Sequence, residues 1–166
     1  MDPFDDPRLT AMGLLAEVFT GLVGKTSPTL AAAGLSEVDF ETLIRLARSP
    51  ERRLRMSDLA AQTSLSTSGI TRVVDRLERD GLVERHACAT DRRASYAVLS
   101  EAGAERLRTV LPQHIEDIET WFTGLLTENN QLADFLKALR VIRDVVRPCA
   151  TAGIREASRA PRAKTG

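Results

Sequence analysis

The chain has 166 residues, long enough for one domain or for a small domain with an appendage, and its 23 basic residues balance its 23 acidic residues. Charged residues make up 28% and apolar residues 43%, which excludes a disordered chain and a membrane-embedded one. A net charge of zero neither favours nor excludes a nucleic-acid partner, so the positions of the arginines have to decide that question.

No uninterrupted apolar run reaches the roughly 18–20 residues that a membrane-spanning helix requires. The first six residues are acidic, whereas a secretory signal starts with a basic segment and continues with an apolar one. We therefore expect a cytoplasmic protein with no membrane partner. Cys88 and Cys149 lie far apart without the spacing of metal ligands, so both are expected to be free thiols in a reducing compartment. We expect no metal ion and no cofactor.

The first predicted helix spans residues 8–25, where apolar side chains recur at three- and four-residue steps. These side chains belong to Leu9, Met12, Leu15, Ala16, Phe19 and Leu22. Pro28 is predicted to end or kink this helix, because proline lacks the amide hydrogen that would continue it.

Two short helices are predicted next, over residues 36–48 and 57–63. Ser36 is a candidate N-terminal cap and Asp39 follows three residues later, which is the spacing of a capping box. The first of the two helices is predicted to stop before Pro50.

A third helix, over residues 66–80, has both of its ends specified by the sequence. Ser66 can cap its start, and Gly81 occupies the position where a left-handed residue often ends a helix. Leu77 and Leu82 have the spacing of the hydrophobic contact that accompanies such an ending. The polar residues of its outward face are Thr67, Ser68, Thr71, Arg72, Asp75, Arg76 and Arg79.

Residues 82–88 and 95–99 are predicted to form the two strands of a hairpin. A long helix is predicted over residues 101–126, with a bend at Pro112. A last helix is predicted to begin at Thr127.

These elements predict a mostly α fold with a small β-hairpin wing, in which a winged helix-turn-helix domain is flanked by long helices. Residues 1–34 are assigned to an N-terminal dimerisation helix, 35–100 to the DNA-binding domain and 101–148 to C-terminal dimerisation helices. Residues 149–166 are expected to be a disordered tail, because they contain few large apolar side chains. Two-fold pairing is expected because the flanking helices carry more apolar surface than one small domain can cover.

A helix presented in this way fits the major groove of DNA, which is roughly 12 Å wide, with its N-terminal residues nearest the bases. Arg72 can present both arms of its guanidinium to a guanine, a contact worth ~1–3 kcal/mol of discrimination. Arg76, one turn later, is better placed for a phosphate. The residues of this helix that we predict to lie at DNA are Ser66, Thr67, Ser68, Thr71, Arg72 and Arg76.

The segment that joins the two strands contains three consecutive charged residues, Asp91, Arg92 and Arg93, and no glycine. A loop beside a recognition helix would lie over the adjacent minor groove, a channel about 6 Å wide with strong negative potential. We predict that either Arg92 or Arg93 is inserted there. Asp91 would be repelled by DNA, so it is predicted to pair with Arg93 or a neighbour and to stiffen the loop.

The segment DRRASYAVLSEAG at 91–103 resembles the wing signature of MarR-family regulators. LSTSGITRVVDRLERDGLVER at 65–85 resembles their recognition helix and first wing strand, and MSDLAAQTSLS precedes it. The resemblance covers about residues 36–103. Carried over by residue, it implies Asp91 and Arg93 as the wing pair and the hydroxyl and arginine residues named above as groove and backbone contacts.

The resemblance also implies a homodimer, built from the N- and C-terminal helices, that reads a pseudo-palindrome in double-stranded DNA. Most proteins of this family repress transcription and release DNA when a small molecule, often an aromatic acid, binds between the dimerisation and DNA-binding parts. The candidate ligand-binding residues here are Met12, Phe19, Phe40 and His114. His114 is included because pockets of the family lie against the corresponding long helix.

Other interpretations remain open at this point. Arg72 and Arg76 could be solvated and pair with acidic neighbours on their own helix, and His86 and His114 could be purely structural. A winged helix can also serve as a protein-binding adaptor without specific DNA binding. An enzyme is not expected, because no catalytic triad, metal-ligand spacing or phosphate loop occurs. The family's peroxide-sensing branch places its reactive cysteine in the first helix. Residues 1–34 contain no cysteine, so oxidation sensing by that route is not expected here.

Overall fold

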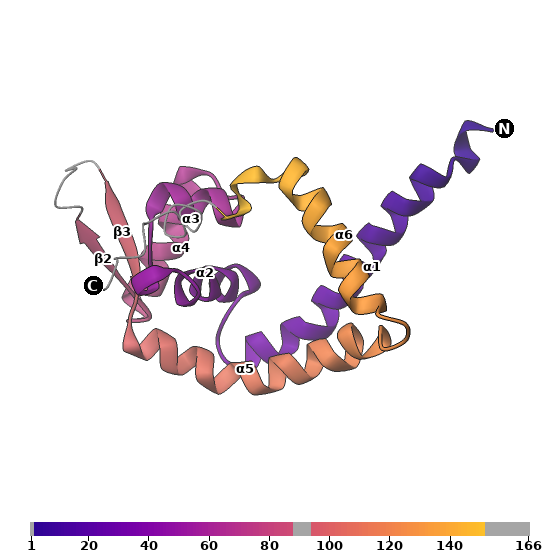
Figure 1. The fold of residues 1–166 in the computed structure, drawn as a ribbon. Helices are drawn as coiled ribbons and strands as arrows, with labels where there is room; N and C mark the ends of the chain where they lie inside the picture. Colours follow the sequence, from indigo (N-terminus) through magenta and orange to yellow (C-terminus); the bar gives the residue numbers. More distant parts are fainter. Residues whose placement is uncertain (1, 88–93, 152–166) are drawn as a thin grey trace, which may run out of the picture.

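The structure is a computed structural model that describes residues 2–87 and 94–151 of the chain (Figure 1). Its described part is mostly helical and contains one antiparallel sheet of three strands, which confirms the predicted mostly α fold with a β wing. A helical body carries the sheet at one side, and the long helices extend from the other side (Figure 1). None of the described helices is long and apolar enough to cross a bilayer.

The first long helix, α1, spans Pro7–Ala32 and continues through Pro28, so the predicted end at that proline is wrong. Thr26 and Ser27 donate their hydroxyls to backbone carbonyls one turn earlier, and the helix packs against α5. Tertiary packing of this kind can stabilise a helix enough for it to continue past a missing amide donor. The helix ends where Gly34 adopts a φ of 72°, a conformation that glycine reaches without a steric penalty.

Helices α2, Glu37–Ala47, and α3, Met56–Thr63, form the first part of the helical body that carries the sheet. The capping box predicted at the start of α2 is present: the Ser36 side chain accepts from the backbone of Asp39, and the Asp39 side chain accepts from the backbone of Ser36. Ser64 ends α3 in the left-handed conformation and starts the tight turn into the next helix.

Helix α4, Thr67–Arg79, ends as its sequence predicts. Gly81 has a φ of 70°, the amide of Leu82 donates to the carbonyl of Leu77 at 2.8 Å, and the amide of Gly81 donates to the carbonyl of Glu78 at 3.0 Å. These two bonds are those of a Schellman motif. The motif turns the chain directly from α4 into the sheet.

The sheet consists of β1, Arg53–Arg55, β2, Val83–Ala87, and β3, Ser95–Leu99, in the order β1-β3-β2. Strands β2 and β3 were predicted and β1 was not. Leu54 of β1 is buried against the core and lies opposite Ala97 of β3, which is also buried. A three-residue strand is too short to show a period of two, and its partner lies some forty residues away in sequence.

The C-terminal helices are shorter than predicted. Helix α5, Glu101–Trp121, ends five residues before the expected boundary, and a short 3-10 helix, η3, follows at Thr123–Leu125. Helix α6, Gln131–Val146, begins four residues later than expected. Asn129 and Asn130 have positive φ angles of 46° and 68°, which prevent the helix from starting earlier.

Part of the expected disordered tail is ordered. Of residues 149–166, the first three belong to a 3-10 helix, η4, at Pro148–Thr151, and Ala150 is buried. A small side chain is enough to dock this segment, which is why a scarcity of large apolar residues was misleading there. Residues 152–166 lie outside the described residues.

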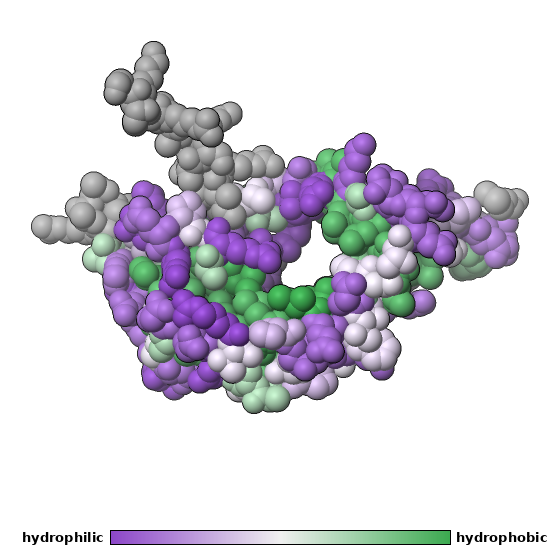
Figure 2. Space-filling model, turned by 60° about the horizontal axis from the view of Figure 1, so that its bottom comes forward, coloured by the Kyte–Doolittle hydropathy of each residue, from purple (hydrophilic) through white to green (hydrophobic). Residues whose placement is uncertain are grey.

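The end of α6 is attached to α2 and α3 of this helical body by two hydrogen bonds. Arg147 donates from Nη2 to the carbonyl oxygen of Gln62 in α3 at 2.9 Å, and Arg45 of α2 donates from Nη1 to the carbonyl oxygen of Ala150 at 3.0 Å. The chain therefore leaves the helical body through α5 and returns to it through α6, and the two paths enclose an opening (Figures 1 and 2).

The hydrophobic core lies among α2, α3, α4 and the sheet and at their junction with α5. Its fully buried large side chains are Leu43, Leu46, Leu59, Ile70, Val74, Leu77 and Val83. By contrast, α6 has no buried residue, and Leu30 is the only buried residue of α1. Figure 2 shows apolar surface around the opening and along the long helices.

Candidate nucleic-acid interface

The N-terminus of α4 presents a group of hydroxyl side chains. The Oγ of Ser66 accepts from the amide of Gly69 at 3.0 Å, which confirms the predicted cap, and lies 3.1 Å from the Oγ of Ser68. Thr71 donates its hydroxyl to the carbonyl of Thr67 at 2.7 Å. Ser66, Thr67 and Ser68 are exposed and Thr71 is half-buried. Because a hydroxyl oxygen has two acceptor lone pairs, these local bonds leave capacity for further contacts.

The two arginines of α4 that were predicted to contact DNA have different surroundings. Arg72 is exposed and forms no ion pair with any residue of 2–87 or 94–151. Arg76 contacts Asp39 of α2 through both Nη2, at 2.5 Å, and Nε, at 3.2 Å. Asp39 is buried and also accepts from Ser36, so Arg76 joins α4 to the start of α2. About 44% of the Arg76 side chain stays exposed.

Arg85 of β2 connects the wing to α4, and the sequence reasoning did not identify it. Its Nη2 lies 2.6 Å from the Oδ1 of Asp75 and donates to the backbone carbonyl of Thr71 at 3.2 Å. A more distant carboxylate, Glu78, lies 3.9 Å from its Nη1. The alternation of side chains in a strand places Arg85 on the same face as the buried Val83, and that pattern could have revealed it.

The exposed face of the sheet carries a second basic cluster, formed by Arg53 and Arg55 of β1 around Tyr96 of β3. The Cζ atoms of the two arginines lie 5.0 and 5.9 Å from the centroid of the Tyr96 ring. Arg55 also donates from Nε to the hydroxyl of Tyr96 at 3.3 Å. Sequence reasoning missed this cluster because it missed β1.

The tip of the wing lies outside the described residues. Asp91, Arg92 and Arg93 belong to the segment 88–93, as does Cys88. The insertion of an arginine into the minor groove and the role of Asp91 therefore remain predictions.

The four candidate ligand-binding residues do not form one site. Phe40 of α2 and His114 of α5 are in contact, with ring centroids 4.5 Å apart and an edge-to-face arrangement. Met12 and Phe19 lie on α1 and are mostly exposed. His114 is buried, which lowers its pKa although Asp117 opposes the shift, and its Nδ1 has no hydrogen-bond partner among the described residues.

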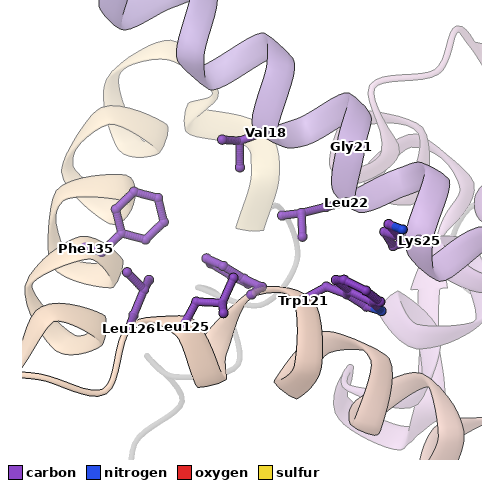
Figure 3. Close-up of a pocket in the computed structure, with 9 residues that line it drawn as sticks. Val18, Gly21, Leu22, Lys25, Trp121, Leu125, Leu126 and Phe135 are labelled. Atoms are coloured by element: carbon purple, nitrogen blue, oxygen red, sulfur yellow. The ribbon is translucent and has the colours of Figure 1, made fainter.

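An apolar pocket of about 460 Å³ lies instead between α1, the end of α5 and α6 (Figure 3). Its lining consists of Val18, Gly21, Leu22, Lys25, Trp121, Phe122, Leu125, Leu126 and Phe135. The Nζ of Lys25 lies 4.3 Å from the centroid of a Trp121 ring, which is the geometry of a cation–π contact. None of the four candidate ligand-binding residues lines this pocket.

Comparison with known proteins gives a family match and several similar proteins. A family model described as MarR family matches residues 33–94. The transcriptional repressor MprA of Escherichia coli strain K12 is 32% identical over 138 residues, which cover 82% of this chain and 77% of that protein.

Two solved structures from Streptomyces coelicolor are also similar. AbsC, a MarR family transcriptional regulator, is 36% identical with a TM-score of 0.78, and the match covers 86% of this chain and 96% of AbsC. Sco3205, a MarR family transcriptional regulator solved in complex with DNA, is 30% identical with a TM-score of 0.77, covering 84% of this chain and 88% of Sco3205.

Proposed function

The chain belongs to the MarR family of transcriptional regulators, and from that membership we propose that it is a homodimeric repressor of transcription. It binds a pseudo-palindromic operator in double-stranded DNA and releases it when a small molecule binds. The observation that carries the proposal is the exposed N-terminal face of α4, on a helix whose two ends are fixed by a serine cap and a Schellman motif. The DNA complex of Sco3205, which shares this fold, supports it.

In the proposed complex, α4 enters the major groove and its N-terminal residues read the bases. Arg72 makes the bidentate contact to a guanine, and Arg76 reaches a phosphate with the part of its side chain that Asp39 leaves exposed. The hydroxyl side chains that bind phosphates or base edges are those of Ser66, Thr67, Ser68 and Thr71. At the wing, Arg92 or Arg93 enters the minor groove and Asp91 pairs with a neighbouring arginine.

The homodimer is supported by the exposed apolar side chains of the long helices. On α1 they are Leu9, Met12, Leu14, Leu15, Val18 and Phe19, and on α6 they are Phe135, Val141, Ile142, Val145 and Val146. Contiguous apolar surface of this kind is characteristic of an interface. Val18 and Phe135 also line the apolar pocket, so we assign the pocket to this interface and a second copy of the chain as its occupant. Met12 and Phe19 then belong to the dimer contact.

For the small-molecule effector we assign the contact between Phe40 and His114. This contact joins α2 of the DNA-binding domain to α5, so a ligand that separates the two rings would change the orientation of one relative to the other. The buried Nδ1 of His114 offers a hydrogen-bonding position that no described residue fills. A phenolic or carboxylic acid has the aromatic surface and the polar group that such a site would take.

The test is the binding of the full chain to a duplex from the promoter of its own gene and to a pool of random duplexes. Fluorescence anisotropy at several salt concentrations should show a logarithm of affinity that falls linearly with the logarithm of salt. Footprinting should show two half-sites about 34–36 Å apart. A protein-binding adaptor would select no duplex from the pool and show no preference over a scrambled sequence, and that result would overturn the proposal.

The effector part is tested separately. Phenolic acids, lipophilic drugs and common metabolites are screened for an increase in melting temperature, and each hit is tested for release of the bound duplex. A hit should lose both effects in the variant His114→Leu and keep them in His86→Gln, where an exposed histidine is changed. Hits that release DNA equally well from both variants would move the effector site away from His114.

A further inference from the structure

The side chains of β2 alternate between the two faces of the sheet, and Arg85 is the charged one on the face toward α4. Its neighbours Glu84 and His86 point to the opposite face, where they lie 3.0 Å apart. Val83, two residues earlier on the face of Arg85, is buried. The guanidinium of Arg85 therefore lies between the strand and the helix, and 30% of its side chain stays exposed.

Arg85 contacts α4 at two positions that are one helical turn apart. Its Nη2 lies 2.6 Å from the Oδ1 of Asp75 and donates to the carbonyl oxygen of Thr71 at 3.2 Å. One acceptor is a side chain and the other belongs to the backbone, so the guanidinium has a defined position along the helix. Thr71 is followed by Arg72, the residue proposed to contact a guanine. Arg85 therefore attaches β2 to the part of α4 that is proposed to lie at DNA.

This contact lies away from the turn that joins the two elements. The chain passes from α4 into β2 at Gly81 and Leu82, beyond the C-terminal end of the helix, whereas Arg85 binds near the middle of the helix. A second contact at a distance from the turn limits the rotation of the strand about it. The residues proposed for the minor groove follow β2 in the sequence. DNA can therefore meet them and α4 together only if β2 keeps a defined direction relative to α4.

We propose that Arg85 is a positioning residue, which holds β2 and α4 in the relative orientation that binds DNA and does not itself contact DNA. The inference rests on the proposed function, because it concerns two parts of the same complex. Without the contact, a smaller fraction of the free protein has this orientation, and the apparent affinity falls in proportion to that fraction. The complex that then forms has the same contacts with DNA as that of the parent.

The variant Asp75→Ala gives the sharpest test, because charge and positioning predict opposite results. Removing a carboxylate from a helix that faces DNA should tighten binding if the overall charge alone decides it. The proposal predicts instead that Asp75→Ala weakens binding about three- to fivefold, the size that a partly exposed ion pair allows. The control is Asp80→Ala, which removes an exposed carboxylate from the C-terminal end of the same helix. It should bind at least as tightly as the parent.

The variant Arg85→Gln tests the same contact from the side of the strand. It should weaken binding by a similar factor and leave the slope of log affinity against log salt unchanged, because the complex that forms is the same. A direct contact of Arg85 with a phosphate would instead lower this slope by about 0.9. The double variant of Arg85→Gln with Asp75→Ala should bind as weakly as Arg85→Gln alone, because both changes remove one shared contact.

Fluorescence anisotropy measures the affinities, and urea denaturation checks that each variant is folded. The proposal stands if Asp75→Ala binds more weakly than both the parent and Asp80→Ala, and if Arg85→Gln keeps the salt slope of the parent. It is overturned if Asp75→Ala binds as tightly as the parent or more tightly, or if Arg85→Gln lowers the slope by the amount of one phosphate. A parent chain that binds no duplex removes the proposed function itself, whereas a parent that binds with unaffected variants removes only the positioning role of Arg85.

Discussion

At the scale of single residues, Arg72 and Arg76 show how position on one helix decides a role. They lie one turn apart on α4, but the buried carboxylate of Asp39 holds only Arg76. Arg72 is exposed and has no ion-pair partner in the described ranges 2–87 and 94–151. In the proposed complex its guanidinium would give up no ion pair with a described residue on binding a base, and the larger share of the discrimination between sequences is expected from it.

Replacing Arg72 should weaken operator binding and relax specificity. Arg72→Ala is expected to cost about 1–3 kcal/mol of binding free energy and to remove the preference at one base-pair position. Anisotropy titrations against operators substituted at each position measure both effects. Arg79→Ala is the matched control, because Arg79 is an exposed arginine near the opposite end of the same helix. If Arg72→Ala and the parent bind the operator with equal affinity, Arg72 does not contact DNA.

His114 gives the protein a specific dependence of stability on pH. Burial holds the pKa of His114 below its ordinary value near 6.5, so between the folded and unfolded pKa values the unfolded chain binds more protons. The resulting stabilisation is complete above the unfolded pKa and is lost as the pH falls through that value toward the folded pKa. His114→Leu should therefore flatten the change in unfolding free energy between about pH 7.5 and 5.5.

Urea denaturation at a series of pH values measures this change. The variant His86→Gln is the control and should keep the pH dependence of the parent, since His86 lies on the exposed face of the sheet. A parallel pH dependence in the parent and in His114→Leu would show that His114 does not carry it.

The residue contacts that the sequence did not predict are those between distant segments. Asp39 was predicted as part of a capping box, a contact over three residues, but its pairing with Arg76 joins positions 37 apart. Arg85 reaches α4 because the hairpin folds back on that helix. The spacing of residues in the sequence predicts helix caps and apolar helix faces, whereas ion pairs of this kind depend on how the elements pack against one another.

At the scale of elements, the junction between the wing and α5 depends on the absence of one side chain. A Cβ atom added at Gly103 would lie 2.2 Å from the carbonyl oxygen of Leu82 and 2.8 Å from the Cδ1 of Leu99. The amide of Gly103 also donates to Ser100 at 2.9 Å, which caps α5. The close approach of α5 to the base of the hairpin therefore requires glycine at this position.

Gly103→Ala is expected to lower the free energy of unfolding by about 1–3 kcal/mol, because the added methyl group would meet a backbone oxygen, which cannot move aside as the end of a flexible side chain can. Chemical denaturation measures the loss. Gly13→Ala is the control: nothing lies within 4 Å of a Cβ there, and alanine is the better helix former. Its stability should equal or exceed that of the parent. A Gly103→Ala chain as stable as the parent would mean that the junction can relax.

The elements that the sequence predicted well are those with signals at both ends. The cap of α2 and the two ends of α4 are present, because a serine cap and a glycine ending act over a few residues. The boundaries of α5 and α6 were wrong because the segment between them, FTGLLTENN, starts with further apolar residues and has no glycine directly after the observed end of α5. Strand β1 exists only through its pairing with β3.

At the scale of the whole molecule, the exposed apolar face of α6 predicts the state of association. Ile142→Asp together with Val145→Asp should convert the proposed dimer to a monomer, because each places a charge in a surface that a partner would cover. Light scattering after size-exclusion chromatography measures the mass. Arg140→Gln on α6 changes the charge by the same amount as one of these substitutions and should leave the dimer intact. A double variant that remains dimeric would place the interface elsewhere.

The return of α6 to α3 limits how the DNA-binding domain can move. A domain joined to its support only through α5 could swivel about a single pivot. The bonds of Arg147 to Gln62 and of Arg45 to Ala150 add a second point of attachment. With attachments at both α5 and η4, the domain is expected to make small rotations about the line that joins the two attachments. A larger movement would first have to break the hydrogen bonds at η4. If two such subunits pair, the distance between their two α4 helices then depends on the hydrogen bonds of Arg45 and Arg147, which lie away from the surface proposed to contact DNA.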